Sequence, residues 1–452
     1  MPAGEPTRLT KSTPKERLHL RWAALVGILS AAFFALGLGD EPFVDEYAYI
    51  TQSYQPDLLF AGRTDDASWL EVLSYDLVPL PKYFINLAFR AAGTPRPSRR
   101  DALAWYEDTS YRWGRGVDLF IARLPSVVLA ALGCIAVFSL GNLFQNASAG
   151  AIAAFLMAAN PLYRLHAHRA MSEAACEALL LLALGLGLWT WKRFVTGGRI
   201  AVCLALMVAA GTVAGLSILA KFNGFLAVFA LCGWAALALV LPGVPLGRKL
   251  TLVIGTGAAV LSAGAVFVAL NPFMTAHPPE PLPEGLRPTA ELPTWKRFEL
   301  LLDRRRDVSR EQQQIFSHNA LHNLGEKARV IVVQGFGRFG PLGPAKSNSN
   351  IRYDSAQDRG ALLWLPVVAT GFGTALWLGQ RQARSGAAPT AWALCVWSLL
   401  ALTVVTMYLP MAWDRYQLPI QAPAALLASL PMSKVWTAGQ RCLWPSRPFP
   451  RP

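Results

Sequence analysis

Long apolar runs separated by polar turns recur along the whole chain, and they limit its fold more than any other feature. An α-helix needs about 20 predominantly apolar residues to cross the hydrocarbon core of a bilayer. Of the 452 residues, 53% are hydrophobic and only 15% are charged, so a soluble domain is not expected. Because backbone polar groups must be satisfied inside a bilayer, we predict an all-α polytopic membrane protein.

The hydrophobic pattern predicts about ten transmembrane helices, within a range of 8–12. They are expected at residues 21–39, 118–142, 149–163, 173–191, 200–219, 222–241, 251–271, 360–379, 390–410 and 417–432. Two long polar segments interrupt them, at 40–117 and at 272–358. Both segments are predicted to carry helices that lie on the membrane surface, from Leu77 to Arg90 in the first and over residues 309–334 in the second.

These boundaries define the expected organisation of the chain. It comprises a basic tail at 1–20, an N-terminal transmembrane module at 21–271 that includes the loop 40–117, a second loop at 272–358, C-terminal transmembrane helices at 359–432, and a tail at 433–452. Lys and Arg dominate both tails and the short connections on the same side, and such residues favour the cytoplasm. We therefore expect cytoplasmic termini and two extracytoplasmic loops.

The net charge of +14 has the same explanation, because the basic residues gather at the predicted cytoplasmic ends of spans. In a soluble protein this charge would suggest a nucleic-acid partner. The sequence has no aromatic-interleaved basic patch and no zinc-finger spacing, so we expect no nucleic-acid partner.

An adjacent acid pair, Asp45 and Glu46, follows the first predicted span among aromatic residues. Three interpretations are open for it. Asp45 could cap the N-terminus of a short helix. A carboxylate at the membrane surface could instead act as a general base on an incoming hydroxyl. Paired acids could also hold a divalent metal through oxygen ligands. Asp40 and Glu41 form a competing pair nearby.

Other charged side chains recur at the predicted outer ends of the spans, where they could bind a phosphate or another part of a substrate. They are Lys82, Arg123, Arg169, Glu173, Lys221 and Arg415, the last with its neighbour Tyr416. Simpler interpretations exist for some of them. Lys82 could be a snorkelling lysine, and Arg169 could pair with Glu173 on one helix face. His166 and His168 could ligate a metal only with a third ligand in register.

The order of these motifs resembles the polytopic C-type (GT-C) glycosyltransferases that use polyprenyl-phosphate sugars. The resemblance is to the branch of protein O-mannosyltransferases and aminoarabinose lipid A transferases, and it covers about residues 20–430. It is carried by Asp45-Glu46-Tyr47, Pro-Leu-Pro-Lys-Tyr at 79–83, Ala-Arg-Leu-Pro-Ser at 122–126, Arg169 with Glu173, the turn at Lys221, and Asp-Arg-Tyr-Gln-Leu-Pro at 414–419. Glu173 stands where the family more often has Asp.

The resemblance implies an enzyme of the mannosyltransferase kind, which transfers a hexosyl or pentosyl group with inversion. Asp45 would be the general base, and Glu46 would orient the base or the acceptor. Lys82 and Arg123, together with Arg415 or Lys221, would stabilise the departing phosphate. The implied partners are a polyprenyl-phosphate sugar, membrane lipids, and an acceptor glycan, lipid or protein. A bacterial inner membrane would be the location. No cofactor is certain, a divalent metal is possible, and no metal ligand is assigned.

Two other classes of protein fit the same pattern of spans. A transporter or flippase of lipid-linked saccharides would bury paired ionisable groups near the midplane or show inverted repeats. A non-catalytic membrane scaffold would use its outer loops to bind a partner. The charges of this chain gather at the predicted outer ends instead, which favours the enzyme.

Overall fold

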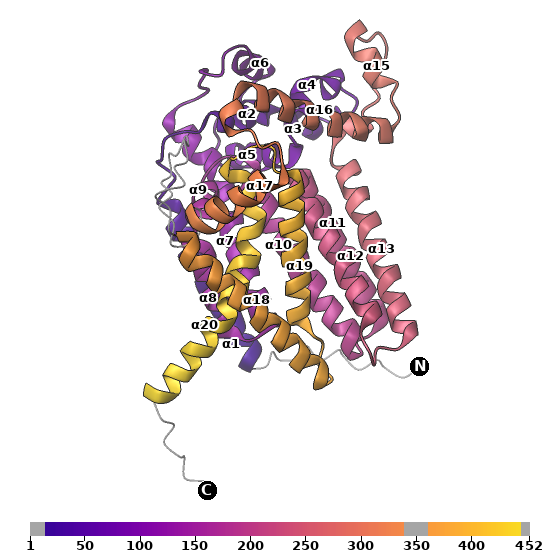
Figure 1. The fold of residues 1–452 in the computed structure, drawn as a ribbon. Coiled ribbons are helices and arrows are strands. Elements are labelled where there is room, and N and C mark those ends of the chain that lie inside the picture. The colour runs from indigo at the N-terminus through magenta and orange to yellow at the C-terminus, as the bar shows by residue number, and fades with distance from the viewer. Residues whose placement is uncertain (1–13, 339–359, 444–452) are drawn as a thin grey trace, which may run out of the picture.

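The structure is a computed structural model that describes residues 14–338 and 360–443 (Figure 1). Within these ranges the regular structure is helical, apart from one isolated antiparallel bridge between Ala320 and Met411. The prediction of an all-α membrane fold is confirmed. The ends of both predicted tails and residues 339–359 of the second loop lie outside the described residues.

Among the described residues, seven segments are long and apolar enough to cross a membrane. They lie in α1 (Pro14–Ala35), α7 (Gly116–Phe144), α10 (Ser172–Thr196), α11 (Ile200–Ala220), α12 (Phe225–Val240, with a preceding 3-10 turn at Phe222–Gly224), α13 (Leu246–Ala269) and α19 (Thr390–Tyr408). The other three predicted spans correspond to α8 (Ala147–Ala159), α18 (Gly360–Arg384) and α20 (Gln421–Leu443). The count of ten spans therefore stays a prediction.

The predicted span at 149–163 is interrupted in the structure. α8 stops at Ala159, and the short helix α9 (Pro161–Ala167) begins immediately after it. Asn160 accounts for the break, because its side-chain oxygen accepts hydrogen bonds from the first backbone amides of α9, at Leu162 and Tyr163. α8 therefore has only 13 residues, fewer than the roughly 20 that cross a bilayer as one straight helix.

Small residues bring the long helices into close contact, as expected where helices pack in lipid. On α11, Gly211 and Gly215 face α13. A Cβ atom added at Gly211 would lie 2.1 Å from the carbonyl oxygen of Ala259, and one added at Gly215 would lie 2.6 Å from that of Ala263. Only glycine permits this approach of the two backbones, so this spacing fixes how α11 packs on α13.

The two outer segments lie at the same end of the bundle, opposite the end where α1 begins and α20 ends (Figure 1). The first contains α2 (Val44–Thr51), a 3-10 turn at Gln52–Tyr54, α3 (Gln55–Phe60), a 3-10 turn at Ala67–Leu70, α4 (Val72–Tyr75), α5 (Pro79–Ala91) and α6 (Arg99–Glu107). The second contains α14 (Pro272–Thr275), α15 (Arg287–Ala290), α16 (Thr294–Ile315), a 3-10 turn at Ser317–Asn319, α17 (Leu324–Val330) and a π-helix at Ile331–Arg338. The helix predicted from Leu77 to Arg90 corresponds to α5.

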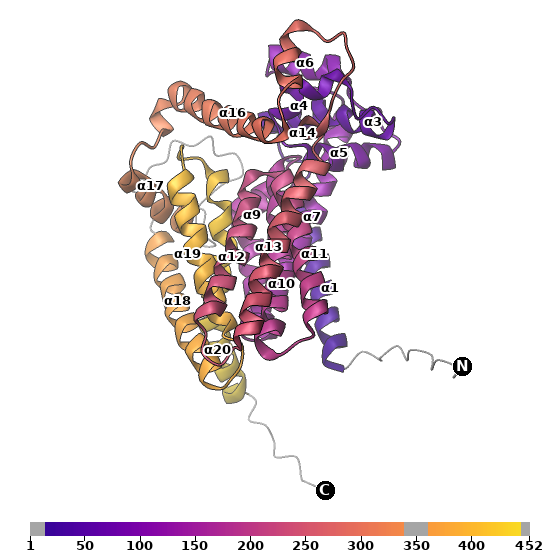
Figure 2. The same ribbon diagram turned by 90° about the vertical axis from the view of Figure 1, so that its right-hand side faces the viewer.

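The single helix predicted over 309–334 is wrong. α16 ends at Ile315, and the stretch before α17 turns aside to pair with the segment that follows α19. The amide of Leu321 donates to the carbonyl of Pro410 at 3.0 Å, and the amide of Ala412 donates to the carbonyl of Asn319 at 2.8 Å. As Figure 2 shows, α16 runs across the outer end of the bundle from α14 toward α17.

Candidate active site

The acid pair lies in the first turn of α2, where one of the two carboxylates caps the helix. α2 begins at Val44, so Asp45 is not the N-cap residue and that prediction is wrong. Glu46 serves this purpose instead, because its Oε2 accepts a hydrogen bond from the backbone amide of Phe43 at 2.8 Å. Of the two adjacent carboxylates, only that of Glu46 caps α2.

Glu46 and Arg123 form a fully buried ion pair between α2 and α7. The Arg123 Nε donates to Glu46 Oε1 at 2.8 Å, and its Nη2 donates to Oε2 at 2.7 Å. The remaining guanidinium donors reach backbone carbonyls, namely those of Leu38, Asp40 and Glu41 at 2.8, 2.7 and 3.3 Å. A guanidinium has five N–H donors, and here all five are used. The predicted role of Arg123 as a phosphate ligand does not fit this arrangement.

Glu46 also bonds to the loop between α9 and α10. Its Oε1 accepts a hydrogen bond from the amide of Ala170 at 2.8 Å. With Arg123 and the Phe43 amide, this gives a carboxylate whose two oxygens are satisfied by protein and whose side chain is 0% exposed. Glu46 therefore has no exposed surface, and its hydrogen bonds hold the first turn of α2, which also contains Asp45.

Asp45, in contrast, is accessible. Its carboxylate keeps 32% of its surface and pairs through Oδ2 with the Nη1 of Arg415, which lies in the 3-10 helix Asp414–Ile420. The Arg415 guanidinium also lies 4.9 Å from the ring centre of Trp413, and Tyr416 stacks on that ring with 6.2 Å between centroids. Burial lowers the pKa of Arg415, but Asp45 more than reverses this and the pKa is above its ordinary value.

Lys221 and Glu173 form a second ion pair, and both residues interact electrostatically with Arg415. The Lys221 Nζ donates to Glu173 Oε1 at 2.7 Å, and the hydroxyl of Ser172 donates to Oε2 at 3.2 Å. Glu173 lies in the first turn of α10, where the helix dipole favours a negative charge. The sequence suggested that Arg169 and Glu173 share one helix face, but Arg169 lies before α10, and its guanidinium is 4.5 Å from the centre of the Phe43 ring.

Lys82 is not a snorkelling lysine, because its side chain is fully buried. Its Nζ donates to Gln55 Oε1 at 3.0 Å, to the carbonyl of Ser74 at 3.2 Å and to that of Leu73 at 3.4 Å. Burial lowers the pKa of Lys82 to about 7. Three protein acceptors thus occupy its three donors, and the predicted phosphate role of Lys82 does not fit this geometry.

The two histidines point at different carboxylates. His166 Nε2 lies 3.7 Å from Asp414 Oδ1, and His168 Nε2 lies 3.1 Å from Asp40 Oδ2. Among residues 14–338 and 360–443, no group of three or more His, Cys, Asp or Glu side chains is placed to hold a metal ion. The divalent metal considered from the sequence therefore has no assigned ligand set in the described part of the chain.

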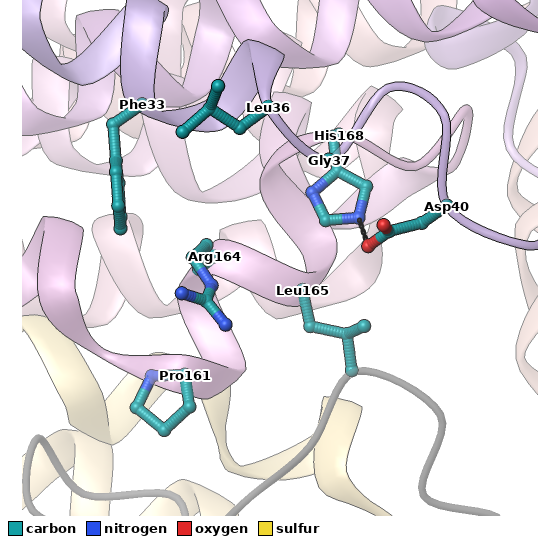
Figure 3. A pocket seen from close by; sticks show the side chains of 8 residues that line it. All are labelled: Phe33, Leu36, Gly37, Asp40, Pro161, Arg164, Leu165 and His168. Atoms are coloured by element: carbon teal, nitrogen blue, oxygen red, sulfur yellow. Dashed lines mark ion pairs between the residues drawn. The ribbon is translucent and has the colours of Figure 1, made fainter.

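A pocket of about 230 Å³ lies at the outer end of α1. Figure 3 shows the ring of His168 turned toward Asp40, with Arg164 on the side of Phe33. The pocket is close to the buried ion pair described above, since the backbone carbonyl of Asp40 is one of the acceptors of Arg123. Asp40 therefore lines this pocket with its side chain and, through its backbone carbonyl, binds the arginine that pairs with Glu46 of α2.

One cation near this site was not singled out from the sequence. Arg305 of α16 has a buried Nη2 that makes no hydrogen bond. It stands in a run of three arginines, 304–306, and the run by itself does not indicate which member turns inward. Helical periodicity relative to buried Leu301 is the signal that could have identified it.

No protein-family model matches the sequence, and no curated protein matches it. Solved structures do. The chain is similar to ArnT from Cupriavidus metallidurans bound to undecaprenyl phosphate, with a TM-score of 0.52 and 14% identity over 93% of this chain and 62% of that one. It is also similar to the Archaeoglobus fulgidus oligosaccharyltransferase in complex with Zn and sulfate, with a TM-score of 0.54 and 16% identity over 93% of this chain and 50% of that one.

A third similar structure is that of AglB from Archaeoglobus fulgidus in complex with an inhibitory peptide and a dolichol-phosphate. Its TM-score is 0.50 and its identity 16%, over 95% of this chain and 52% of that one. The chain covers less than two thirds of each of these three proteins. At such identities the similarity establishes the fold, and the chain has the GT-C fold of polytopic membrane glycosyltransferases.

Proposed function

We propose that this protein is a membrane glycosyltransferase that moves a sugar from a polyprenyl-phosphate carrier to an acceptor hydroxyl on the extracytoplasmic face. The observation that carries the proposal is the contrast between two neighbouring acids. Glu46 is buried and fully bonded, whereas Asp45 is held by Arg415 and remains open to a substrate. Similarity in fold to structures containing undecaprenyl phosphate and dolichol-phosphate supports a lipid-phosphate donor.

The proposed reaction is a single displacement. Asp45 accepts the proton of the acceptor hydroxyl, whose oxygen forms a bond to the anomeric carbon. The bond from that carbon to the phosphate oxygen breaks, and the phosphate leaves with the electron pair. Attack opposite the leaving group inverts the anomeric configuration. Arg415 orients the base, and its charge, with that of Lys221, stabilises the negative charge of the phosphate.

The remaining predicted residues support this arrangement in the proposal. Glu46 and Arg123 fix the first turn of α2, and Lys82 fixes the fold of the first outer segment. Glu173 holds Lys221, Arg169 borders the site over the ring of Phe43, and Tyr416 borders it between Arg415 and the ring of Trp413.

We place the site on the extracytoplasmic face of a bacterial inner membrane. The distribution of charge supports this orientation, because the helix ends opposite the site carry Lys192, Arg193, Arg248 and Arg381. Such residues favour the cytoplasmic side. For the transferred sugar, the sequence resemblance favours a mannosyl group.

The decisive experiment measures sugar transfer by the purified protein in proteoliposomes, using a panel of undecaprenyl-phosphate sugars and scoring released undecaprenyl phosphate. Asp45→Asn should slow release by about 100-fold or more, since it removes the general base. Asp108→Asn is the matched control, because Asp108 is an exposed acid of the same outer segment. An Asp45→Asn protein with wild-type turnover would contradict the assignment of the base.

The same proteoliposomes distinguish the alternative classes of protein. A flippase would move the intact lipid-linked sugar between leaflets without breaking its glycosyl–phosphate bond. A scaffold would do neither. Transbilayer movement without release of undecaprenyl phosphate would therefore replace the glycosyltransferase proposal with the transport one.

A further inference from the structure

Most cations at the outer end of the bundle are already paired with the protein. All donors of Arg123 and Lys82 are used, Lys221 is bonded to Glu173, and Arg415 is bonded to Asp45. Arg305 differs from these, because its Nη2 is buried and has no hydrogen-bond partner. Leaving a buried donor of a charged group without an acceptor is unfavourable, because the group loses its hydration and gains no protein partner. A ligand that accepts this hydrogen bond would remove the penalty.

The helical phase of α16 explains why Arg305 turns inward. Arg297, Leu301 and Arg305 are four residues apart, so they lie along one face of the helix. Arg297 is fully buried and Leu301 is 4% exposed, which shows that this face packs on the protein. Arg306 lies on another face, with 63% of its side chain exposed and paired with Asp303.

Contacts between the two outer segments hold Arg305 in place. The neighbouring Arg304 pairs with Asp76, with 3.3 Å between Nε and Oδ1. Asp76 in turn accepts a hydrogen bond from the hydroxyl of Tyr106 at 2.7 Å, and that hydroxyl accepts one from Gln52 at 3.2 Å. α16 is therefore pinned to the first outer segment, which carries Asp45.

The charge of Arg305 acts on residues that neighbour the proposed base and its partner Arg415. Burial raises the pKa of Tyr49, which lies one turn after Asp45 on α2, and the charge of Arg305 opposes this rise. The charge of Arg305 also opposes the rise in the pKa of Tyr416, which follows Arg415 in the chain. Arg305 belongs to α16, which runs across the outer end of the bundle (Figure 2).

We propose that Arg305 binds the phosphate of the lipid-linked donor, and this inference rests on the proposed function. A guanidinium presents parallel N–H donors that match phosphate oxygens, and such contacts are among the strong hydrogen bonds of proteins. In a displacement with inversion, the hydroxyl and the phosphate lie on opposite sides of the anomeric carbon. Asp45 and Arg305 come from different outer segments, as base and phosphate ligand. The second outer segment therefore supplies a binding residue to the site.

The test measures binding and transfer separately in the full-length protein. Binding uses undecaprenyl phosphate, with undecaprenol as the probe that lacks phosphate. Arg305→Gln should raise the Kd for undecaprenyl phosphate at least tenfold and leave the Kd for undecaprenol unchanged. Arg305→Lys should give an intermediate value, because lysine keeps the charge but not the fork. Arg306→Gln is the matched control on the same helix and should bind like the wild type.

Three results would overturn the assignment. The first is an unchanged Kd for undecaprenyl phosphate in Arg305→Gln while the wild type binds and transfers. If that variant does not fold, the same result in Arg305→Lys decides. The second is displacement of undecaprenyl phosphate by phosphatidylglycerol at equal concentration, which would indicate a general lipid-headgroup site. In the third, the wild type neither binds undecaprenyl phosphate nor transfers a sugar, and the proposed function fails as well.

Discussion

The buried ion pair of Glu46 and Arg123 gives the sharpest test of how the site is built. Both side chains are 0% exposed and meet in two parallel hydrogen bonds of 2.8 and 2.7 Å. Replacing one partner leaves the other charge buried without its counter-ion. Removing one member of such a pair typically destabilises a protein by about 3–5 kcal/mol. We expect this loss for Arg123→Met, and a similar loss for Glu46→Gln.

The structure also indicates which variant suffers more. Glu46 keeps two backbone donors when Arg123 is removed, those of Phe43 and Ala170. In Arg123→Met, however, three backbone carbonyls lose their donor in addition to the carboxylate. Arg123→Met should therefore be at least as destabilising as Glu46→Gln. The double variant should be less destabilised than the sum of the two, by about 1–3 kcal/mol, because the interaction is lost only once.

The assay is denaturant unfolding of the detergent-purified protein, followed by tryptophan fluorescence, for the wild type, both single variants and the double variant. Sugar transfer is measured on the same samples at a temperature where all are folded. If Glu46→Gln is as stable as the wild type and yet inactive, Glu46 takes part in the chemistry and the structural assignment is wrong. Loss of stability with residual transfer by the folded fraction is the expected outcome.

Two further predictions concern other parts of the structure. Gly211→Ala places a Cβ atom 2.1 Å from the carbonyl oxygen of Ala259 and should destabilise the protein by about 1–3 kcal/mol in the same unfolding assay. Gly257→Ala is the control, because a Cβ atom added there meets nothing within 4 Å. Equal stability of the two variants would contradict the packing argument. Burial lowers the pKa of His168 from 6.5 to about 4, while Asp40 opposes the shift. Between these values the unfolded state binds more protons, so stability should fall by up to about 3 kcal/mol as the pH drops from 6.5 to 4. Tm measured against pH should drop less in His168→Phe, and parallel curves would refute this.

Hydropathy determined much of the fold from the sequence alone. A bilayer requires helices of a certain length, and runs such as 118–142 and 200–219 satisfy it without help from the rest of the chain. Two breaks were not foreseen: Asn160 starts a new helix inside the predicted span 149–163, and residues 319–321 pair with the segment that follows α19 inside the predicted helix 309–334. Local side-chain bonds and long-range backbone pairing decide such breaks.

The sequence also identified the acid pair and most of the charges around it, because few ionisable residues interrupt the apolar pattern. It could not assign their partners. Arg415 is 370 residues from Asp45, and Arg123 is 77 residues from Glu46. A cationic side chain can pair with a carboxylate of the protein or stay available to a substrate. The outcome depends on which groups the helices bring within hydrogen-bond distance.

Only the tertiary structure decided which charged side chains are bonded to other protein groups and which stay open to a ligand. Burial with a full set of protein acceptors turned Lys82 and Arg123 into structural residues, while packing of α16 left a donor of Arg305 unpaired. The physical reason is that a donor already bonded to a protein acceptor is not available to a ligand. Which acceptors lie within hydrogen-bond distance of each donor depends on the tertiary structure.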